Sequence, residues 1–174
     1  MRTSEAEALY RFYRSADQAA RLMRLSADRL LPEGLTFAQF ELLDLLLQHA
    51  RGQGEDVSIT RDGNAQQNGI TPMMAADELG LTRGSLTSLL NQLTAGKLAV
   101  TRTDPEDRRS KHIWITARGR ALHRQAMIEL SGLTSAMLAV FSRERFSGVQ
   151  GVLDEFVQWL ETEGRLQSGV SRSK

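Results

Sequence analysis

The stretch 98–120, LAVTRTDPEDRRSKHIWITARGR, constrains the fold of this chain more than any other part of it. Residues 101–103 and 112–116 are rich in β-forming types, and the second run alternates polar and apolar side chains. The intervening Asp-Pro-Glu-Asp at 104–107 favours a turn, because proline presets φ and aspartate side chains bond to nearby backbone groups. The sequence therefore predicts a β-hairpin with a charged tip.

Four basic residues lie at the tip or the base of this predicted hairpin: Arg102, Arg108, Arg109 and Lys111. A narrow ribbon that carries cations in this way is shaped to enter a nucleic-acid groove. A basic hairpin is also often no more than solvent-facing surface. Its interpretation therefore depends on the residues that precede it.

Two short helices are predicted directly before the hairpin. Thr71 and Pro72 begin the first, because threonine caps free N–H groups and proline fits the first helical position. Gly80 ends this helix as the residue after its cap. Thr82 caps the second helix, RGSLTSLLNQLTAG. Two short helices joined by a tight turn that contains glycine form a helix-turn-helix unit.

The second helix has two chemically different faces. Its leucines at 86, 89, 90 and 93 recur at the helical spacing and are predicted to be buried. The opposite face carries Arg83, Ser85, Thr87, Ser88 and Asn91. Hydroxyl, amide and guanidinium groups suit base edges and phosphates in a major groove. A Ser/Thr-rich face is more often plain solvated surface, but the order helix, helix, strand, basic tip, strand favours DNA binding.

Positive charge is concentrated in the same part of the chain. Residues 82–124 contain nine Lys and Arg and three acidic residues, a net charge of +6. The whole chain is +1, so the remaining residues sum to −5. A nearly neutral protein with one strongly basic block has the electrostatic pattern expected for binding a polyanion.

From about residue 70 to 122 the sequence resembles, without gaps, the multiple-antibiotic-resistance regulator (MarR) family of bacterial winged-helix transcription regulators. ITPMMAADELGLTRGSLTSLLNQL is similar to the family's two-helix unit, TDPEDRRSKHIWITARGRAL to its wing, and LTFAQFELLDLLL to the helix before them. The resemblance implies that Arg109 enters the minor groove and that Asp107 orients it. A narrow, electronegative groove does attract arginine, and an adjacent carboxylate can fix its fork. The DNA-binding candidates are Thr82, Arg83, Ser85, Thr87, Ser88, Asn91, Arg102, Asp107, Arg108, Arg109 and Lys111.

The sequence departs from the family pattern at two positions. The family usually has glycine just before the first wing strand, where this chain has Lys97, and Gly96 stands one residue earlier. We therefore expect the recognition helix to end one residue early. The family often has two arginines in the first wing strand, whereas this chain has Thr101 and Arg102. One phosphate contact is expected to be missing.

Long helices are predicted on both sides of the winged helix-turn-helix. Apolar residues recur at helical spacing in 5–31 and in 37–49, where Thr36 is the expected cap. Thr116 caps a helix to about 141, and Ser142 begins a last helix to about 163. The predicted fold is mainly α with a small β-wing.

The predicted domains are an N-terminal dimerisation helix (1–34), a DNA-binding domain (35–122), C-terminal dimerisation helices (123–165) and a flexible tail (166–174). Pairing of two subunits through the terminal helices is what the resemblance implies, and packing on the chain's own core is the alternative. A dimer fits DNA half-sites, because two recognition helices then lie about one helical turn apart, roughly 34–36 Å.

Residues 51–69, RGQGEDVSITRDGNAQQNG, form a longer connection than the corresponding link in the family. Their glycines and amides predict a mobile loop insertion with a small hairpin around 57–63. Extra DNA contact or partner binding is the functional alternative to a plain connection.

Several classes of protein are not favoured by the sequence. The chain has no cysteine, which excludes disulfides and thiol chemistry. It has no signal-peptide pattern and no run of about 18 apolar residues, so a cytoplasmic protein without a membrane span is expected. His49, His112 and His123 lack metal-ligand spacing and are expected to be ordinary surface histidines. No phosphate loop, nucleophile elbow or carboxylate pair indicates an enzyme, and no cofactor is expected.

The most favoured function is that of a dimeric regulator of transcription that binds double-stranded DNA at a pseudo-palindromic operator, as a repressor released by a small molecule. The alternative is a winged-helix protein-interaction module without a DNA role. Members of the family often bind small molecules between the dimer helices and the DNA module. Residues that could line such a cleft here are Tyr10, Phe12, Arg21 and Phe40.

Overall fold

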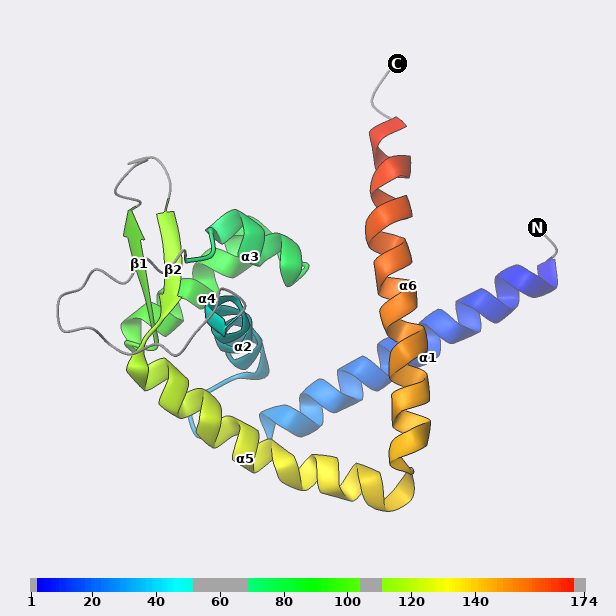
Figure 1. The fold of residues 1–174 in the computed structure, drawn as a ribbon, viewed down its shortest axis with the longest axis horizontal. Coiled ribbons are helices and arrows are strands. Elements are labelled where there is room, and N and C mark those ends of the chain that lie inside the picture. Colours follow the sequence, from blue (N-terminus) through cyan, green and yellow to red (C-terminus); the bar gives the residue numbers. More distant parts are fainter. Residues whose placement is uncertain (1–2, 52–68, 104–110, 171–174) are drawn as a thin grey trace. The chain divides into compact units, whose positions relative to one another are not determined.

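The structure is a computed structural model that describes residues 3–51, 69–103 and 111–170. Its elements, in chain order, are α1 (Thr3–Asp28), α2 (Phe37–Arg51), α3 (Pro72–Glu78), α4 (Arg83–Ala95), β1 (Ala99–Thr103), β2 (Lys111–Ile115), α5 (Ala117–Val140) and α6 (Arg143–Val170) (Figure 1). This mainly helical chain with one small antiparallel sheet confirms the predicted fold class. Residues 1–131 form one compact unit and residues 132–174 a second.

The wing is built from β1 and β2, which pair antiparallel from Ala99 opposite Ile115 to Thr103 opposite Lys111. Side chains alternate across such a ribbon, and Ala99, Ile113 and Ile115 are on the buried face. Ile70 adds a third backbone segment, because its carbonyl accepts the N–H of Ile113 at 2.9 Å. No local sequence pattern predicts this bridge.

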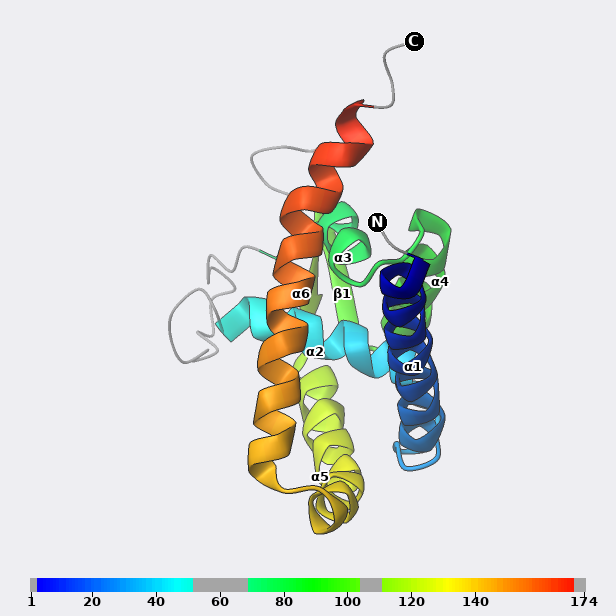
Figure 2. The ribbon, with the colours of Figure 1, turned by 90° about the vertical axis from the view of Figure 1, so that its right-hand side faces the viewer.

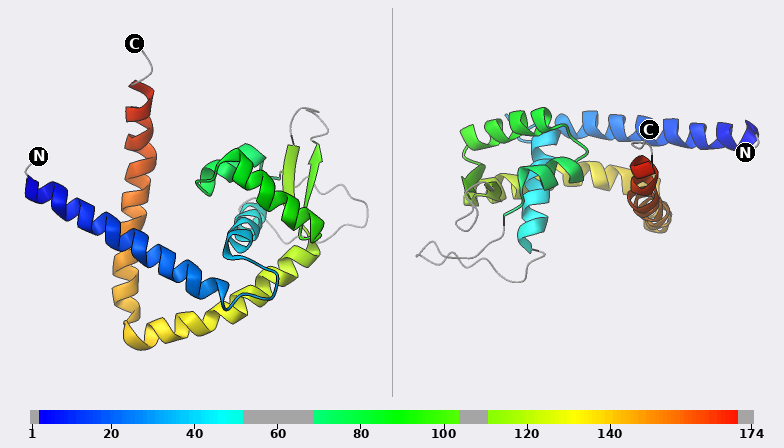
Figure 3. Two further views of the ribbon diagram at one scale, coloured as in Figure 1. Left: turned by 180° about the vertical axis from the view of Figure 1, so that it is seen from behind. Right: turned by 90° about the horizontal axis from the view of Figure 1, so that it is seen from above.

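The core of the first unit lies where α2 packs against the sheet and α4 (Figures 2 and 3). Its largest fully buried side chains are Leu42, Leu43, Ile70, Leu86, Leu93 and Ile113. These residues come from α2, from the segment before α3, from α4 and from β2. The helix-turn-helix and the wing therefore share one apolar core, which fixes α4 relative to the hairpin.

The turn between α3 and α4 follows the predicted capping pattern. Thr71 accepts the N–H of Met74 at the start of α3, and Thr82 accepts the N–H of Ser85 at the start of α4. Gly80 has φ +62°, a conformation that glycine adopts without the steric penalty of a side chain. These predictions of helix ends are confirmed.

The start of α2 is closed by a reciprocal pair of hydrogen bonds. The Thr36 side chain accepts the N–H of Gln39 at 3.3 Å, and the Gln39 side chain accepts the N–H of Thr36 at 2.9 Å. This arrangement is a capping box, which satisfies two otherwise free donors at once. It confirms Thr36 as the cap.

The sequence predicts that α4 ends one residue early, and the structure differs. Gly96 keeps a right-handed conformation with φ −72°, and Lys97 takes the left-handed one with φ +58°. Two bonds complete this cap: the N–H of Leu98 donates to Leu93 at 2.8 Å, and that of Lys97 to Thr94 at 3.0 Å. The helix keeps its length because these hydrogen bonds hold a lysine where glycine is preferred.

Replacement of Lys97 by glycine is therefore expected to stabilise the fold. A non-glycine residue with positive φ is disfavoured by about 1 kcal/mol, and glycine removes that penalty without loss of the backbone bonds. Urea denaturation followed by circular dichroism would measure the gain, with Gly96→Ala as the comparison. An unchanged or lower unfolding free energy for Lys97→Gly would contradict this account of the cap.

Three helix bounds differ from those predicted. α1 ends at Asp28 rather than near 31, since Pro32 disfavours helix in the residue before it. The N–H groups of Leu30 and Leu31 both donate to the carbonyl of Ala27. α2 continues to Arg51. α6 continues to Val170 rather than ending near 163, because a glycine within a helix lowers its stability without ending it. The predicted hairpin around 57–63 lies outside the described residues.

His123 is not the surface residue that the sequence predicts. It is buried, its Nε2 lies 2.8 Å from Oδ1 of Asp44, and its ring stacks on Phe40 with the centroids 5.1 Å apart. The contact joins α5 to α2. A lone histidine on a helix gives no sequence signal for a partner that lies 79 residues away.

The terminal helices expose large apolar side chains: Leu9, Tyr10, Phe12, Tyr13, Leu22, Met23 and Leu25 on α1, and Val149, Val152, Leu153, Val157, Trp159 and Leu160 on α6. Groups of exposed apolar side chains of this kind are unusual on a monomer and commonly mark an interface. Within the described ranges, no helix taken singly is long and apolar enough to cross a membrane. The segments 117–140 and 143–160 meet that test only when taken together across a bend.

Candidate nucleic-acid interface

The outward face of α4 is the first part of the candidate interface. Leu86 and Leu93 are buried and anchor the helix in the core. All of its predicted DNA-contacting residues are exposed on the other side: Thr82, Arg83, Ser85, Thr87, Ser88 and Asn91. The predicted polar face is confirmed as exposed. Of the four leucines predicted to be buried, Leu86 and Leu93 are, whereas Leu89 and Leu90 are only partly buried against the core.

Hydrogen bonds at the start of α4 fix the direction of its hydroxyl groups. The oxygens of Thr82 and Ser85 lie 2.8 Å apart, and that of Thr82 also accepts the N–H of Ser85. The Thr87 hydroxyl donates to the carbonyl of Arg83 at 2.8 Å. The oxygen of Thr87 is thereby left to act as an acceptor toward solvent. These bonds set the direction of the Thr82, Ser85 and Thr87 hydroxyl groups.

The wing supplies the second part of the interface. The Arg102 guanidinium carbon lies 5.9 Å from the centre of the Trp114 ring, within the range of a cation–π contact. Val100 lies opposite Trp114 in the register, so Arg102 reaches its diagonal neighbour across the strands. Trp114 was not predicted as a support for Arg102, although the predicted strand pairing could have indicated it.

A hollow of about 480 Å³ lies where the helix-turn-helix meets the wing. Its lining residues come from the start of α3, from α4 and from the first residue of β2: Thr71, Pro72, Met73, Arg83, Leu86, Thr87 and Lys111. Arg83 and Lys111 thus belong to one concave surface although 28 positions separate them in the chain. Two cations and a hydroxyl on one surface suit an anionic oxygen group such as a phosphate.

Three predicted wing residues, Asp107, Arg108 and Arg109, lie outside the described residues. Their groove contact therefore stays a prediction. The strand ends on either side of them, Thr103 and Lys111, are paired and exposed.

The wing is held to α5 by a compact set of contacts. Thr116 accepts the N–H of Gly119 at 3.0 Å, which confirms it as the cap, and its own N–H donates to Leu98 at 3.0 Å. Gly119 lies so close to the chain that a Cβ there would collide with the carbonyl oxygen of Leu98. It would also lie 2.9 Å from Cγ1 of Ile115. Only glycine permits this approach of α5 to the base of the hairpin.

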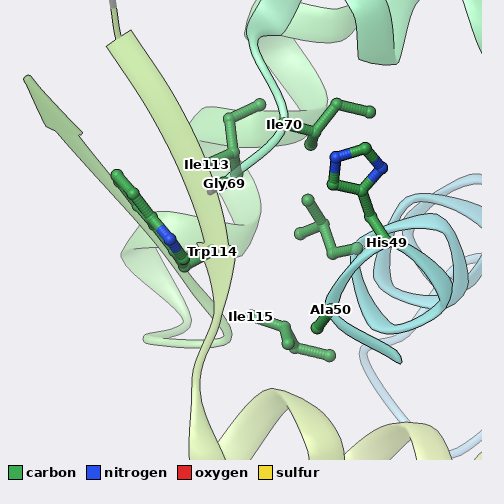
Figure 4. A pocket seen from close by; sticks show the side chains of 8 residues that line it. His49, Ala50, Gly69, Ile70, Ile113, Trp114 and Ile115 are labelled. Carbon is green, nitrogen blue, oxygen red and sulfur yellow. The ribbon is translucent and has the colours of Figure 1, made fainter. Parts of the chain in front are cut away.

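A cavity lined by residues of α2, of the segment before α3 and of β2 is too small for an organic ligand. It holds about 20 Å³ and is lined in part by His49, Ala50, Gly69 and Trp114 (Figure 4). That volume fits about one water molecule. A Cβ on Gly69 would lie 2.6 Å from Cε2 of Trp114, so the chain passes directly against the indole.

The four residues proposed from the sequence to line a ligand cleft are not brought together. Tyr10, Phe12 and Arg21 are exposed on α1, where Arg21 pairs with Asp17 at 3.1 Å. Phe40 is buried on α2 against His123. Among the described residues, no group of three His, Asp or Glu side chains is placed to hold a metal ion.

A comparison with known protein families gives a match over part of the chain. Residues 63–110 match the sequence pattern of the MarR family. A search of curated proteins by sequence finds no match.

Solved structures of MarR regulators share the fold. The chain is similar to S. aureus MepR in a DNA complex (22% identity, 84% of this chain and 96% of that chain, TM-score 0.65). It is also similar to a MarR-family regulator from Rhodococcus sp. RHA1 (18%, 90% and 95%, TM-score 0.67). A third similar structure is PcaV from Streptomyces coelicolor with its natural ligand (17%, 84% and 89%, TM-score 0.60).

Proposed function

This chain carries the sequence pattern of the MarR family over residues 63–110 on the fold of MarR transcription regulators, and from that premise we propose that it is a repressor which binds DNA as a homodimer. Its target is a pseudo-palindromic operator in double-stranded DNA, and a small molecule releases it. The observation that carries the proposal is the joint surface of α4 and the wing, where Arg83, Thr87 and Lys111 line one hollow. The family and the fold are those of regulators rather than of an enzyme.

The charge distribution favours DNA over a protein partner. A net charge of +6 falls within residues 82–124, which include α4 and the wing. A winged-helix module that binds only proteins has no need of this concentration of cations. MepR is described in a complex with DNA and PcaV with a natural ligand, which supports both halves of the proposal by analogy.

The test is fluorescence anisotropy with the DNA upstream of the protein's own gene, in the presence of excess unrelated duplex. We expect binding that the unrelated duplex does not displace, and footprints in two half-sites. Equal affinity for any duplex would refute sequence-specific recognition, and no binding to duplex DNA would favour the protein-interaction alternative.

Arg109→Ala is expected to weaken specific DNA binding by about 1–3 kcal/mol, the scale of one good groove contact, with the fold unchanged. The reason is its predicted position at the wing tip next to Asp107. Arg29→Ala removes the same charge from an exposed position before α2 and serves as the control. Equal losses in the two variants would show that general charge, and not a groove contact, is responsible.

A dimer is expected because α6 exposes an apolar face that includes Leu153 and Leu160. Light scattering should give twice the 19.4 kDa mass of one chain at micromolar concentration. Leu153→Glu should shift the mass to that of a monomer, since a buried, unpaired carboxylate opposes association. Gln158→Glu adds the same charge on the opposite side of the helix and should leave the dimer intact. A monomeric wild-type protein that binds both half-sites would refute the dimer.

A further inference from the structure

A second cavity, of about 340 Å³, lies beneath the turn of the helix-turn-helix. Its walls include Arg24 and Asp28 at the end of α1, Phe37 and Glu41 at the start of α2, and Leu79 and Leu81 from the turn. All of these belong to the first unit of the chain. The volume is that of a small-molecule site and not of a single water molecule.

The polar part of this cavity carries two carboxylates and one guanidinium. Asp28 is held in place, because its Oδ1 accepts the N–H of Phe37 at 2.6 Å. Glu41 is held less firmly: its Oε1 lies 4.0 Å from Nη2 of Arg24, beyond hydrogen-bond distance. The Arg24 side chain is 61% exposed, so water screens much of its attraction. The cavity is left with an excess of negative charge.

Burial disfavours the charged form of the Glu41 carboxyl. Desolvation raises the pKa of its carboxyl above the usual value, the charge of Arg24 lowers it, and the charge of Asp28 raises it. The net pKa shift is upward, so Arg24 compensates the carboxylate incompletely. A second cation beside Glu41 would supply the positive charge that Arg24 does not provide.

The remaining walls decide what kind of cation fits. Phe37, Leu79 and Leu81 present apolar groups, which favour an organic body over a hydrated metal ion. We propose that this cavity binds an organic cation, an amidinium, guanidinium or protonated amine on an apolar body, with its N–H groups donating to Glu41. This inference rests on the proposed function, because it assigns the effector site of the regulator.

The cavity is connected to the recognition helix by two routes. An occupant touches Leu79, Gly80 and Leu81, the turn from which α4 begins. It also touches Thr36, whose capping box includes Gln39. The side-chain amide of Gln39 then donates to Oε1 of Gln92 on α4 at 2.7 Å. A cation that moves the start of α2 or the turn therefore changes the position of α4, and we expect it to lower DNA affinity.

The binding test uses the full-length protein without DNA and benzamidinium as the probe, with benzoate as a probe of similar size and opposite charge. Isothermal titration calorimetry should detect benzamidinium binding and much weaker binding of benzoate. Glu41→Gln should weaken benzamidinium about tenfold or more, the scale of one charge-assisted hydrogen bond. Arg24→Gln should strengthen it, because a competing cation is removed.

The matched control is Glu33→Gln, which removes an exposed carboxylate before α2 that does not line the cavity. Its affinity for benzamidinium should equal that of the wild type. Preference for benzoate, or equal losses in Glu33→Gln and Glu41→Gln, would overturn the proposal. Glu41→Gln and Arg24→Gln should shift the affinity for benzamidinium in opposite directions. If one variant fails to fold, the other still tests the proposal.

A second measurement separates this site from the proposed function. Saturating benzamidinium should lower the affinity of the wild type for its operator several-fold, and Glu41→Gln should resist this effect. Unchanged operator affinity at saturation would overturn the effector role. A protein that binds benzamidinium through Glu41 but binds no DNA at all would refute the proposed function and leave the cation site supported.

Discussion

Gly119→Ala is expected to lower the unfolding free energy by about 3 kcal/mol or more, because the added methyl group has no room. It would collide with the carbonyl oxygen of Leu98, which is backbone and cannot rotate away, and it would press on Ile115. The methyl group fits only if α5 moves away from the hairpin. That movement breaks the hydrogen bonds between Thr116 and Leu98. The wing and α5 would then lose their common anchor.

Gly132→Ala is the matched control for this prediction. It makes the same change in the same helix, and nothing lies within 4 Å of the added Cβ. Since alanine favours helix over glycine, this variant should gain roughly 0.5–1 kcal/mol. Urea denaturation followed by circular dichroism measures both. Equal changes in unfolding free energy for the two variants would refute the close contact between Gly119 and the carbonyl oxygen of Leu98.

DNA affinity is expected to fall by on the order of 10³ between 50 and 200 mM salt. Each subunit offers Arg83, Arg102 and Lys111 on the described surface and, by prediction, Arg108 at the wing tip. A dimer that neutralises six phosphates releases enough counterions for a loss of this size. Anisotropy titrations at four salt concentrations would give the slope.

Arg83→Ala should reduce that slope by about one for each subunit, because one phosphate contact per subunit is lost. Arg29→Ala lies outside the hollow and should leave the slope unchanged. A flat salt profile for the wild type would show that the cations of α4 and the wing do not bind DNA phosphates. An equal slope in Arg83→Ala would show that the hollow does not bind phosphate.

The parts of the fold that the sequence predicted correctly depend on neighbours in the chain. Thr71, Thr82 and Thr116 cap the helices that follow them, since the N–H groups they bind lie three residues away. The alternation in β2 predicted its buried face, and the leucine spacing in α4 predicted its polar face. The exposed polar residues of α4 could therefore be named from the sequence.

The tertiary structure alone decided how distant segments meet. The burial of His123 against Asp44 and the bridge from Ile70 to Ile113 join segments far apart in the chain. The same is true of the hollow that Arg83 shares with Lys111 and of the cavity beneath the turn. Sequence spacing reports periodicity within one element, so it determined the helices, their caps and the hairpin of this protein. Contacts between elements depend on the packing of the whole core, and only the tertiary structure could supply them.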